Sequence, residues 1–180
     1  MPQTLLSTVA AASRPALTGR HAPWKLWLAL VLFAVVGSCL YGASLAWVLP
    51  GWKAMDAAVW LAASSGLAWC VFIPSLRWGL GIRWETCIHA ALVTMAGGEV
   101  VLLSGALLNA LLAVQHATEH AIFLNYTVVA ISNAAMASLL AGQLRLRGIP
   151  VRRTLMLWFV VLNGSGAFFF TLLYRTFHGA

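Results

Sequence analysis

Charged side chains are scarce in this sequence. Only 8% of its 180 residues are Asp, Glu, Lys or Arg, and only four of them are acidic. A soluble domain carries about 25% charged residues, so this chain has too few to cover a surface that faces water. The scarcity excludes an ordinary soluble globular protein. The four carboxylates are also spread along the chain, which leaves no pair suited to acid–base catalysis.

Motifs for several kinds of chemistry are missing as well. There is no Gly-rich phosphate-binding loop and no nucleophile elbow. The three cysteines, Cys39, Cys70 and Cys87, form no CxxC pair, so we expect them to be small buried hydrophobic residues rather than disulfides or metal ligands. Haem held between helices would need two histidines at similar depth, and the apolar segments lack them. No cofactor is predicted apart from the metal considered below, and enzymatic activity is the less favoured class.

Long apolar runs dominate what is present. Hydrophobic residues make up 62% of the chain, and five segments are long enough to cross a hydrocarbon core of about 30 Å as helices. These segments lie at 24–48, 57–76, 86–114, 121–144 and 154–174. The sequence therefore predicts an all-α, polytopic integral membrane bundle of five transmembrane helices at 24–174, between an N-terminal segment at 1–23 and a tail at 175–180. We expect Pro74 to bend or end the second helix.

Basic residues are distributed unevenly between the predicted helices. Nine Lys and Arg residues fall on the side of the N-terminus and of the second and fourth loops, and two fall on the other side. Cytoplasmic loops carry an excess of Lys and Arg, so we expect a cytoplasmic N-terminus and an external C-terminus, in a bacterial inner membrane. The net charge of +7 is then explained by orientation in the bilayer, and no nucleic-acid partner is predicted.

Each predicted helix has a polar side chain near its middle. Glu99 is the most unusual of them, because a charge at the bilayer centre costs at least about 2.5 kcal/mol. We expect it to point into the bundle and to be protonated unless water or a cation reaches it. Residue counts from the cytoplasmic ends place five further side chains at similar depth: Ser38, Ser64, Asn133, Asn163 and Ser165.

These six residues form a predicted midplane polar cluster. Interhelical hydrogen bonds contribute roughly 0.6–2 kcal/mol each in a membrane, so the cluster is favoured as a device that fixes how the helices align. An ion or proton path through Glu99, and a pocket for a lipid or small substrate, are the alternatives.

Small residues repeat along the third predicted helix. Such residues let a neighbouring helix backbone approach closely. They recur every seven residues in two series: Ala91, Gly98 and Gly105, and Ala90, Gly97 and Ser104. The fifth predicted helix contains NGSGA at 163–167, which places Gly164 and Gly166 beside Asn163. We expect these to be two matching, closely packed faces.

The third loop contains the sequence QHATEHA. His116, Glu119 and His120 match the H-x-x-E-H pattern of inverzincin metalloproteases, and the predicted topology brings His178 to the same side. A metal site at the outer face is one interpretation. A solvated polar loop is favoured, because the domain that would surround a protease motif is missing.

The passage YGASL…GWKAM at 41–55 resembles uncharacterised small bacterial inner-membrane proteins. Five spans, a cytoplasmic N-terminal segment and glycine-rich later helices are also similar to the Yip family. The resemblance covers 24–174 and implies a non-enzymatic membrane protein, with no individual site residues.

The function favoured by these features is a non-catalytic membrane subunit or scaffold. Its expected partners are the lipid bilayer and other integral membrane proteins or a second copy of itself. One alternative is a small transporter or a conductor of ions or protons that uses Glu99, Asn133 and Asn163. The second alternative is a metal-dependent membrane enzyme that uses the external histidines.

Overall fold

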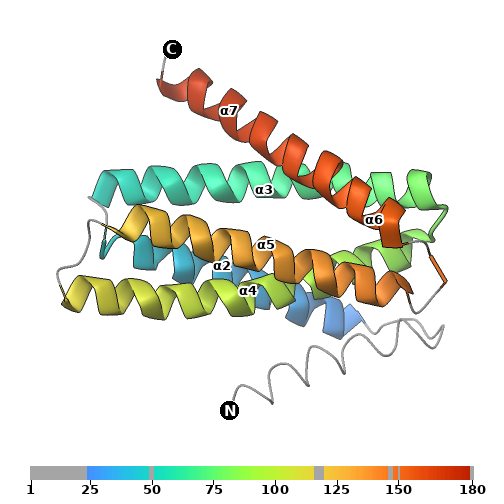
Figure 1. Ribbon diagram of the computed structural model, residues 1–180, viewed down its shortest axis with the longest axis horizontal. Coiled ribbons are helices and arrows are strands. Elements are labelled where there is room, and N and C mark those ends of the chain that lie inside the picture. Colours follow the sequence, from blue (N-terminus) through green and yellow to red (C-terminus); the bar gives the residue numbers. More distant parts are fainter. Residues whose placement is uncertain (1–23, 49–50, 116–119, 146–147, 150, 179–180) are drawn as a thin grey trace.

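The computed structural model describes the chain except residues 1–23, 49–50, 116–119, 146–147, 150 and 179–180. The described residues form helices and no strand (Figure 1). In chain order the helices are α2 (Trp24–Leu45), α3 (Gly51–Leu80), α4 (Trp84–Val114), α5 (Ala121–Arg145), α6 (Val151–Leu157), the π-helical segment η2 (Trp158–Asn163) and α7 (Gly164–His178).

Five helices among the described residues are long and apolar enough to cross a membrane. They are Trp24–Leu45, Ala58–Leu80, Trp84–Val114, Phe123–Arg145 and Val151–Thr176, the last made of α6, η2 and α7 together. The predicted all-helical class with five membrane-length helices is therefore confirmed. The 31 residues of α4 span about 46 Å at 1.5 Å per residue, so this helix exceeds the apolar thickness of a bilayer unless it tilts.

The helices α2, α3, α4 and α5 lie side by side, and α7 crosses α3 obliquely (Figure 1). α4 packs mainly against α2 and α5, whereas α7 packs mainly against α3. The loops after α3 and α5 lie at one end of the bundle, together with the start of α2. We call this the basic end, because Arg77, Arg83, Arg145, Arg152 and Arg153 belong to the helix ends and loop found there.

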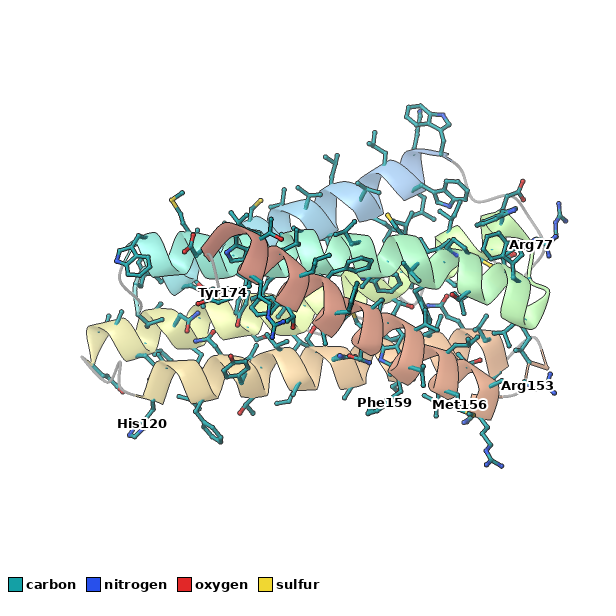
Figure 2. The ribbon with its side chains drawn as sticks, turned by 90° about the horizontal axis from the view of Figure 1, so that it is seen from above. Arg77, His120, Arg153, Met156, Phe159 and Tyr174 are labelled. Atoms are coloured by element: carbon teal, nitrogen blue, oxygen red, sulfur yellow. The ribbon has the colours of Figure 1, made fainter. Side chains whose placement is uncertain are left out.

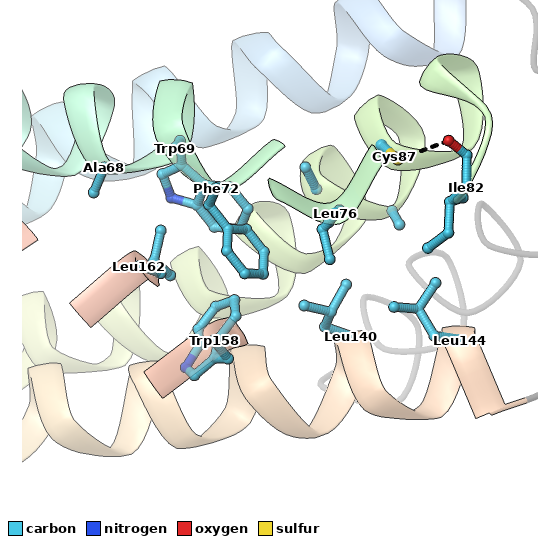
Figure 3. Close-up of a cluster of buried hydrophobic side chains, with 12 residues drawn as sticks. Ala68, Trp69, Phe72, Leu76, Ile82, Cys87, Leu140, Leu144, Trp158 and Leu162 are labelled. Carbon is cyan, nitrogen blue, oxygen red and sulfur yellow. Dashed lines mark hydrogen bonds between the residues drawn. The ribbon is translucent and has the colours of Figure 1, made fainter. Parts of the chain in front are cut away.

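The largest apolar core lies in the half of the bundle near the basic end. Trp158 of η2 contacts the rings of Trp69 and Phe72 of α3 edge to face, with ring centroids 5.8 and 5.4 Å apart (Figure 3). Leu140 and Leu144 of α5 complete this side of the cluster. Lipid tails are as apolar as these side chains, so their contribution in a membrane is close van der Waals packing.

Two expectations about individual residues are wrong in part. Pro74 does not end its helix, because α3 continues through it to Leu80, and the expected bend stays a prediction. Proline is tolerated inside membrane helices, although at this position it leaves the Cys70 carbonyl without its helical N–H donor. Cys87 is buried as expected, but Cys39 and Cys70 are exposed on the helix surfaces, where a small apolar thiol can face lipid.

Candidate functional site

Glu99 lies in the contact between α4 and α2. Its side chain is 7% exposed, and its Oε1 accepts a 2.7 Å hydrogen bond from the Ser38 hydroxyl of α2. Its Oε2 is buried and has no hydrogen-bond partner among the described residues. Ser38 itself is exposed on the surface of α2. The carboxyl is therefore held by one hydroxyl, at the edge of the bundle rather than at its axis.

Gly37 makes room for this carboxyl. A Cβ atom added to Gly37 would lie 2.8 Å from Oε2 and 3.1 Å from the Cβ atom of Glu99, which is closer than van der Waals contact allows. The absence of a side chain at this position lets α2 pack directly over Glu99. Gly37 therefore covers Oε2 while Ser38 binds Oε1.

Asn133 and Asn163 form a second polar group. The Asn133 side-chain amide donates to Oδ1 of Asn163, and the indole N–H of Trp158 donates a 2.7 Å bond to Oδ1 of Asn133. The Asn163 amide donates to the Trp158 carbonyl at 3.2 Å, within the π-helical turn. This group joins α5 to η2, and its indole is the same one that packs in the apolar core.

The two remaining midplane serines bond within their own helices. Ser64 donates to the Leu61 carbonyl at 3.2 Å, and Ser165 donates to the Val161 carbonyl. The six residues of the predicted midplane cluster thus divide into the Ser38–Glu99 pair, the Asn133–Asn163 group and two serines that cap their own backbone. The hydrogen bonds of the described residues do not join Glu99 to Asn133 or Asn163.

A third polar group lies farther from the basic end and was not singled out from the sequence. The amides of Asn109 and Asn125 bond each other reciprocally, with N···O distances of 3.1 and 2.8 Å. Asn109 also donates to Ser44 Oγ at 2.9 Å, and the Tyr41 hydroxyl donates to Asn125 Oδ1 at 2.7 Å. This Asn109–Asn125 network joins α2, α4 and α5.

The sequence did contain a signal for this network. Asn109 precedes the end of α4 by five residues, Asn125 follows the start of α5 by four, and Ser44 is one residue from the end of α2. Residue counts place all three within about 8 Å of the helix ends that lie away from the basic end. They lie near the ends of their helices and not in the middle, so the polar residues at mid-membrane depth do not include them.

The small residues of α4 pack against α5 and α2. An added Cβ atom at Gly97 would overlap Leu139 of α5, and added Cβ atoms at Gly98 and Gly105 would lie 2.5 and 2.6 Å from side-chain atoms of Met136 and Val128 of the same helix. The Ser132 hydroxyl of α5 also donates to the Gly98 carbonyl at 3.0 Å.

The glycines of α7 do not meet this α4 face. Gly166 lies against Ala68 of α3, and among the described residues no atom outside its own helix backbone lies within 4 Å of a Cβ added to Gly164. The two glycine faces therefore have different neighbours.

The predicted metal ligands are described only in part. His116 and Glu119 lie outside the described residues, as does the side chain of His178. His120 is exposed and lies at the opposite end of the molecule from Arg77 and Arg153 (Figure 2). Among the residues searched, no three His, Cys, Asp or Glu side chains are grouped to hold a metal, so the metal site stays a prediction.

His89 marks a further polar contact between α2 and α4. It is 1% exposed, and its Nδ1 accepts a 3.1 Å hydrogen bond from the indole of Trp27. Three polar contacts are therefore spaced along these two helices, at His89, Glu99 and Asn109. The contacts at His89 and Asn109 join neutral groups across helices. Of these three contacts, only the one at Glu99 leaves a buried polar atom, Oε2, without a hydrogen-bond partner among the described residues.

No family model, curated protein or solved structure matches this chain. The resemblance to the Yip family and to small bacterial inner-membrane proteins stays a prediction, and the function rests on the geometry of the chain itself.

Proposed function

We propose that this protein is a non-catalytic integral membrane subunit that packs against another membrane protein or a second copy of itself. One observation supports this function above the others. The exposed face of α5 has a small residue at every fourth position, namely Ala130, Ala134, Ser138 and Gly142, and all four are exposed. No atom of the described residues lies within 4 Å of a Cβ added to Gly142.

This stripe differs from a surface built only to face lipid. On α2 most of the exposed residues are large and apolar, among them Val31, Leu32, Val35, Val36 and Leu40. A series of small residues at four-residue spacing lets a second helix approach closely in a membrane, where association depends on packing rather than on the hydrophobic effect. The stripe on α5 is therefore a surface for another transmembrane helix.

The polar side chains of the bundle fit the same function. The Asn109–Asn125 network and the Asn133–Asn163 group use their amides to join helices of this chain. The described helices leave only short connections between them, and nearly all of the described chain belongs to membrane-length helices. We place the protein in a bacterial inner membrane with the basic end in the cytoplasm, as the excess of Lys and Arg at that end favours.

The test uses larger side chains on the stripe. Ala134→Leu and Ser138→Leu should weaken association at least about tenfold, or about 1.4 kcal/mol, because leucine holds the helix backbones apart. The measurement is the mass of the native assembly in mild detergent and in lipid nanodiscs, where a homo-oligomer and a complex with a different subunit have different masses.

Matched controls come from α2 and α4. Ala29→Leu and Ser104→Leu make the same changes at exposed positions whose neighbours four residues away are large, namely Lys25 and Phe33, and Val100 and Leu108, and they should leave the assembly unchanged. A wild-type protein that remains a lone monomer in both media would contradict the proposed function.

A further inference from the structure

The environment of Glu99 offers little to an ionised carboxylate. Ionised, the group has two oxygens with about four acceptor positions, and an uncompensated charge at this depth costs at least about 2.5 kcal/mol. The described residues supply one donor, the Ser38 hydroxyl at 2.7 Å. The second oxygen lies against Gly37 without a hydrogen-bond partner among them.

The same environment suits a neutral carboxyl. A protonated carboxyl has one O–H to donate, and a serine hydroxyl accepts as well as donates. With the proton on Oε1, the Glu99–Ser38 bond is kept with its direction reversed, and Oε2 becomes a carbonyl oxygen that is far less costly to leave unpaired than a charge. One hydroxyl is then enough for the buried group.

No charged group of the described helices lies beside this carboxyl. On α2 the nearest titratable residues in sequence to Ser38 are Cys39 and Tyr41, and the Tyr41 hydroxyl donates to Asn125. On α4 the nearest is His89, ten residues away, or about 15 Å along the helix.

The helices α3 and α5 place their ionisable residues near their ends. These are Lys53, Asp56 and Arg77 on α3, and Tyr126 and Arg145 on α5, with Cys70 the exception on α3. A proton is therefore the species that neutralises Glu99.

We propose that Glu99 is a reversible proton-binding site, reached from the exposed face of α2 through Ser38. The carboxyl is buried, but the hydroxyl bonded to it is exposed among the large apolar residues Val35, Val36 and Leu40. A divalent cation is a poor alternative occupant, since Glu99 and Ser38 together offer three side-chain oxygens where Ca²⁺ or Mg²⁺ takes about six or more ligands. The site is formed by α2 and α4 and is separate from the small-residue stripe of α5.

A hydrophobic carbodiimide tests the proposal on the full-length protein. The reagent reacts with a protonated carboxyl: the carboxyl proton moves to one carbodiimide nitrogen, the carboxyl oxygen bonds to the central carbon, and the adduct rearranges to a stable N-acylurea with no leaving group. The labelled chain gains the mass of one reagent molecule. Mass spectrometry of its peptides should locate the adduct on Glu99 in wild-type protein.

The dependence of the labelling rate on pH shows whether Glu99 carries a proton when it reacts. Above the pH at which half of the groups are ionised, the rate should fall about tenfold per pH unit, and at fixed pH added sodium chloride should have no effect. A water-soluble carbodiimide should label Glu99 at least about tenfold more slowly, because the route passes through the apolar surface of α2. Absence of an adduct, a rate that does not change with pH, or protection by sodium ions would each overturn the proposal, the last in favour of an alkali-cation site.

Variants distinguish labelling of Glu99 from labelling of other carboxyl groups of the chain. Glu99→Gln should remove the adduct, whereas Glu85→Gln, which changes an exposed carboxyl in the first turn of α4, should leave it in place. Ser38→Ala should let labelling of Glu99 continue at more alkaline pH, because the hydroxyl binds the ionised carboxylate more strongly than the neutral carboxyl. Ser65→Ala, an exposed serine of α3, should show the wild-type profile, and a Ser38→Ala profile equal to it would contradict the role of Ser38.

Discussion

At the scale of single residues, the polar side chains of this bundle differ in what they join. Asn109 has no exposed surface and contacts two other helices, through Ser44 of α2 and Asn125 of α5. Ser104, five residues earlier, is exposed and donates only to the Val100 carbonyl of its own helix. Both residues are polar and lie on one membrane helix, but only Asn109 fixes how three helices align.

Replacing Asn109 should therefore destabilise the bundle. Asn109→Ala removes three interhelical hydrogen bonds and leaves the amide of Asn125 with fewer partners, so we expect the free energy of unfolding in detergent to fall by about 1–3 kcal/mol. The measurement is unfolding in a mixed-detergent titration.

The exposed Ser104 supplies the control for this prediction. Ser104→Ala should change the unfolding free energy by less than about 0.5 kcal/mol. Equal effects of the two substitutions would show that the Asn109–Asn125 network adds nothing to stability.

At the scale of helices, close approach depends on glycines with particular neighbours. A Cβ added to Gly105 of α4 would lie 2.6 Å from Val128 Cγ1 and 3.0 Å from the Tyr41 ring. Valine has few side-chain conformations in a helix, and the Tyr41 hydroxyl is held by Asn125. Neither neighbour moves easily, so Gly105 determines how near α4 lies to both α5 and α2.

Gly105→Ala should destabilise the protein by about 1–3 kcal/mol through overpacking, although alanine favours a helix over glycine by about 1 kcal/mol. Gly66→Ala is the matched control, because in the part of the chain that the structure describes no atom beyond its own helix backbone lies within 4 Å of the Cβ it would add on α3, and it should be neutral or slightly stabilising. Thermal unfolding in one detergent measures both. A Gly105→Ala protein as stable as Gly66→Ala would contradict the tight contact.

The helices themselves could be predicted from the sequence, but their neighbours could not. Long apolar runs require helices in a membrane, because the backbone must satisfy its own hydrogen bonds there. These helices are apolar nearly all round, so no amphipathic pattern shows which side faces which neighbour. For that reason the sequence predicts that the glycines at 97, 98 and 105 pack against the fifth span, which is made of α6, η2 and α7. In the structure they pack against α5, which is the fourth span, and against α2.

The candidate sites could also be predicted from the sequence only in part. Glu99 could be found because a carboxylate in an apolar helix is costly, but its depth indicated Ser38 only as one of five possible partners. The π-helical turn at Trp158–Asn163 has no signal in composition or periodicity, since it depends on how Trp158 packs between α3 and α5. The bond from the Trp158 indole to Asn133 was missed with it.

At the scale of the whole molecule, the two ends of the bundle predict an orientation in the membrane. The loop after α3 contains Arg83, whose side chain is 80% exposed, and the opposite end contains the exposed His120 (Figure 2). Lys and Arg near the helix ends are retained in the cytoplasm during insertion. The basic end should therefore be cytoplasmic, with His120 on the external side.

Single cysteines at the two ends test this orientation. In a variant whose native cysteines are replaced by alanine, His120→Cys should react with a membrane-impermeant maleimide in intact cells, at a rate at least about tenfold above that of Arg83→Cys, because the bilayer excludes a charged reagent. Arg83→Cys leaves eight of the nine basic residues on its side, so the expected orientation is kept, and it should react only after the cells are permeabilised. The opposite pattern would show an inverted chain, in which the charge asymmetry of the loops does not determine insertion.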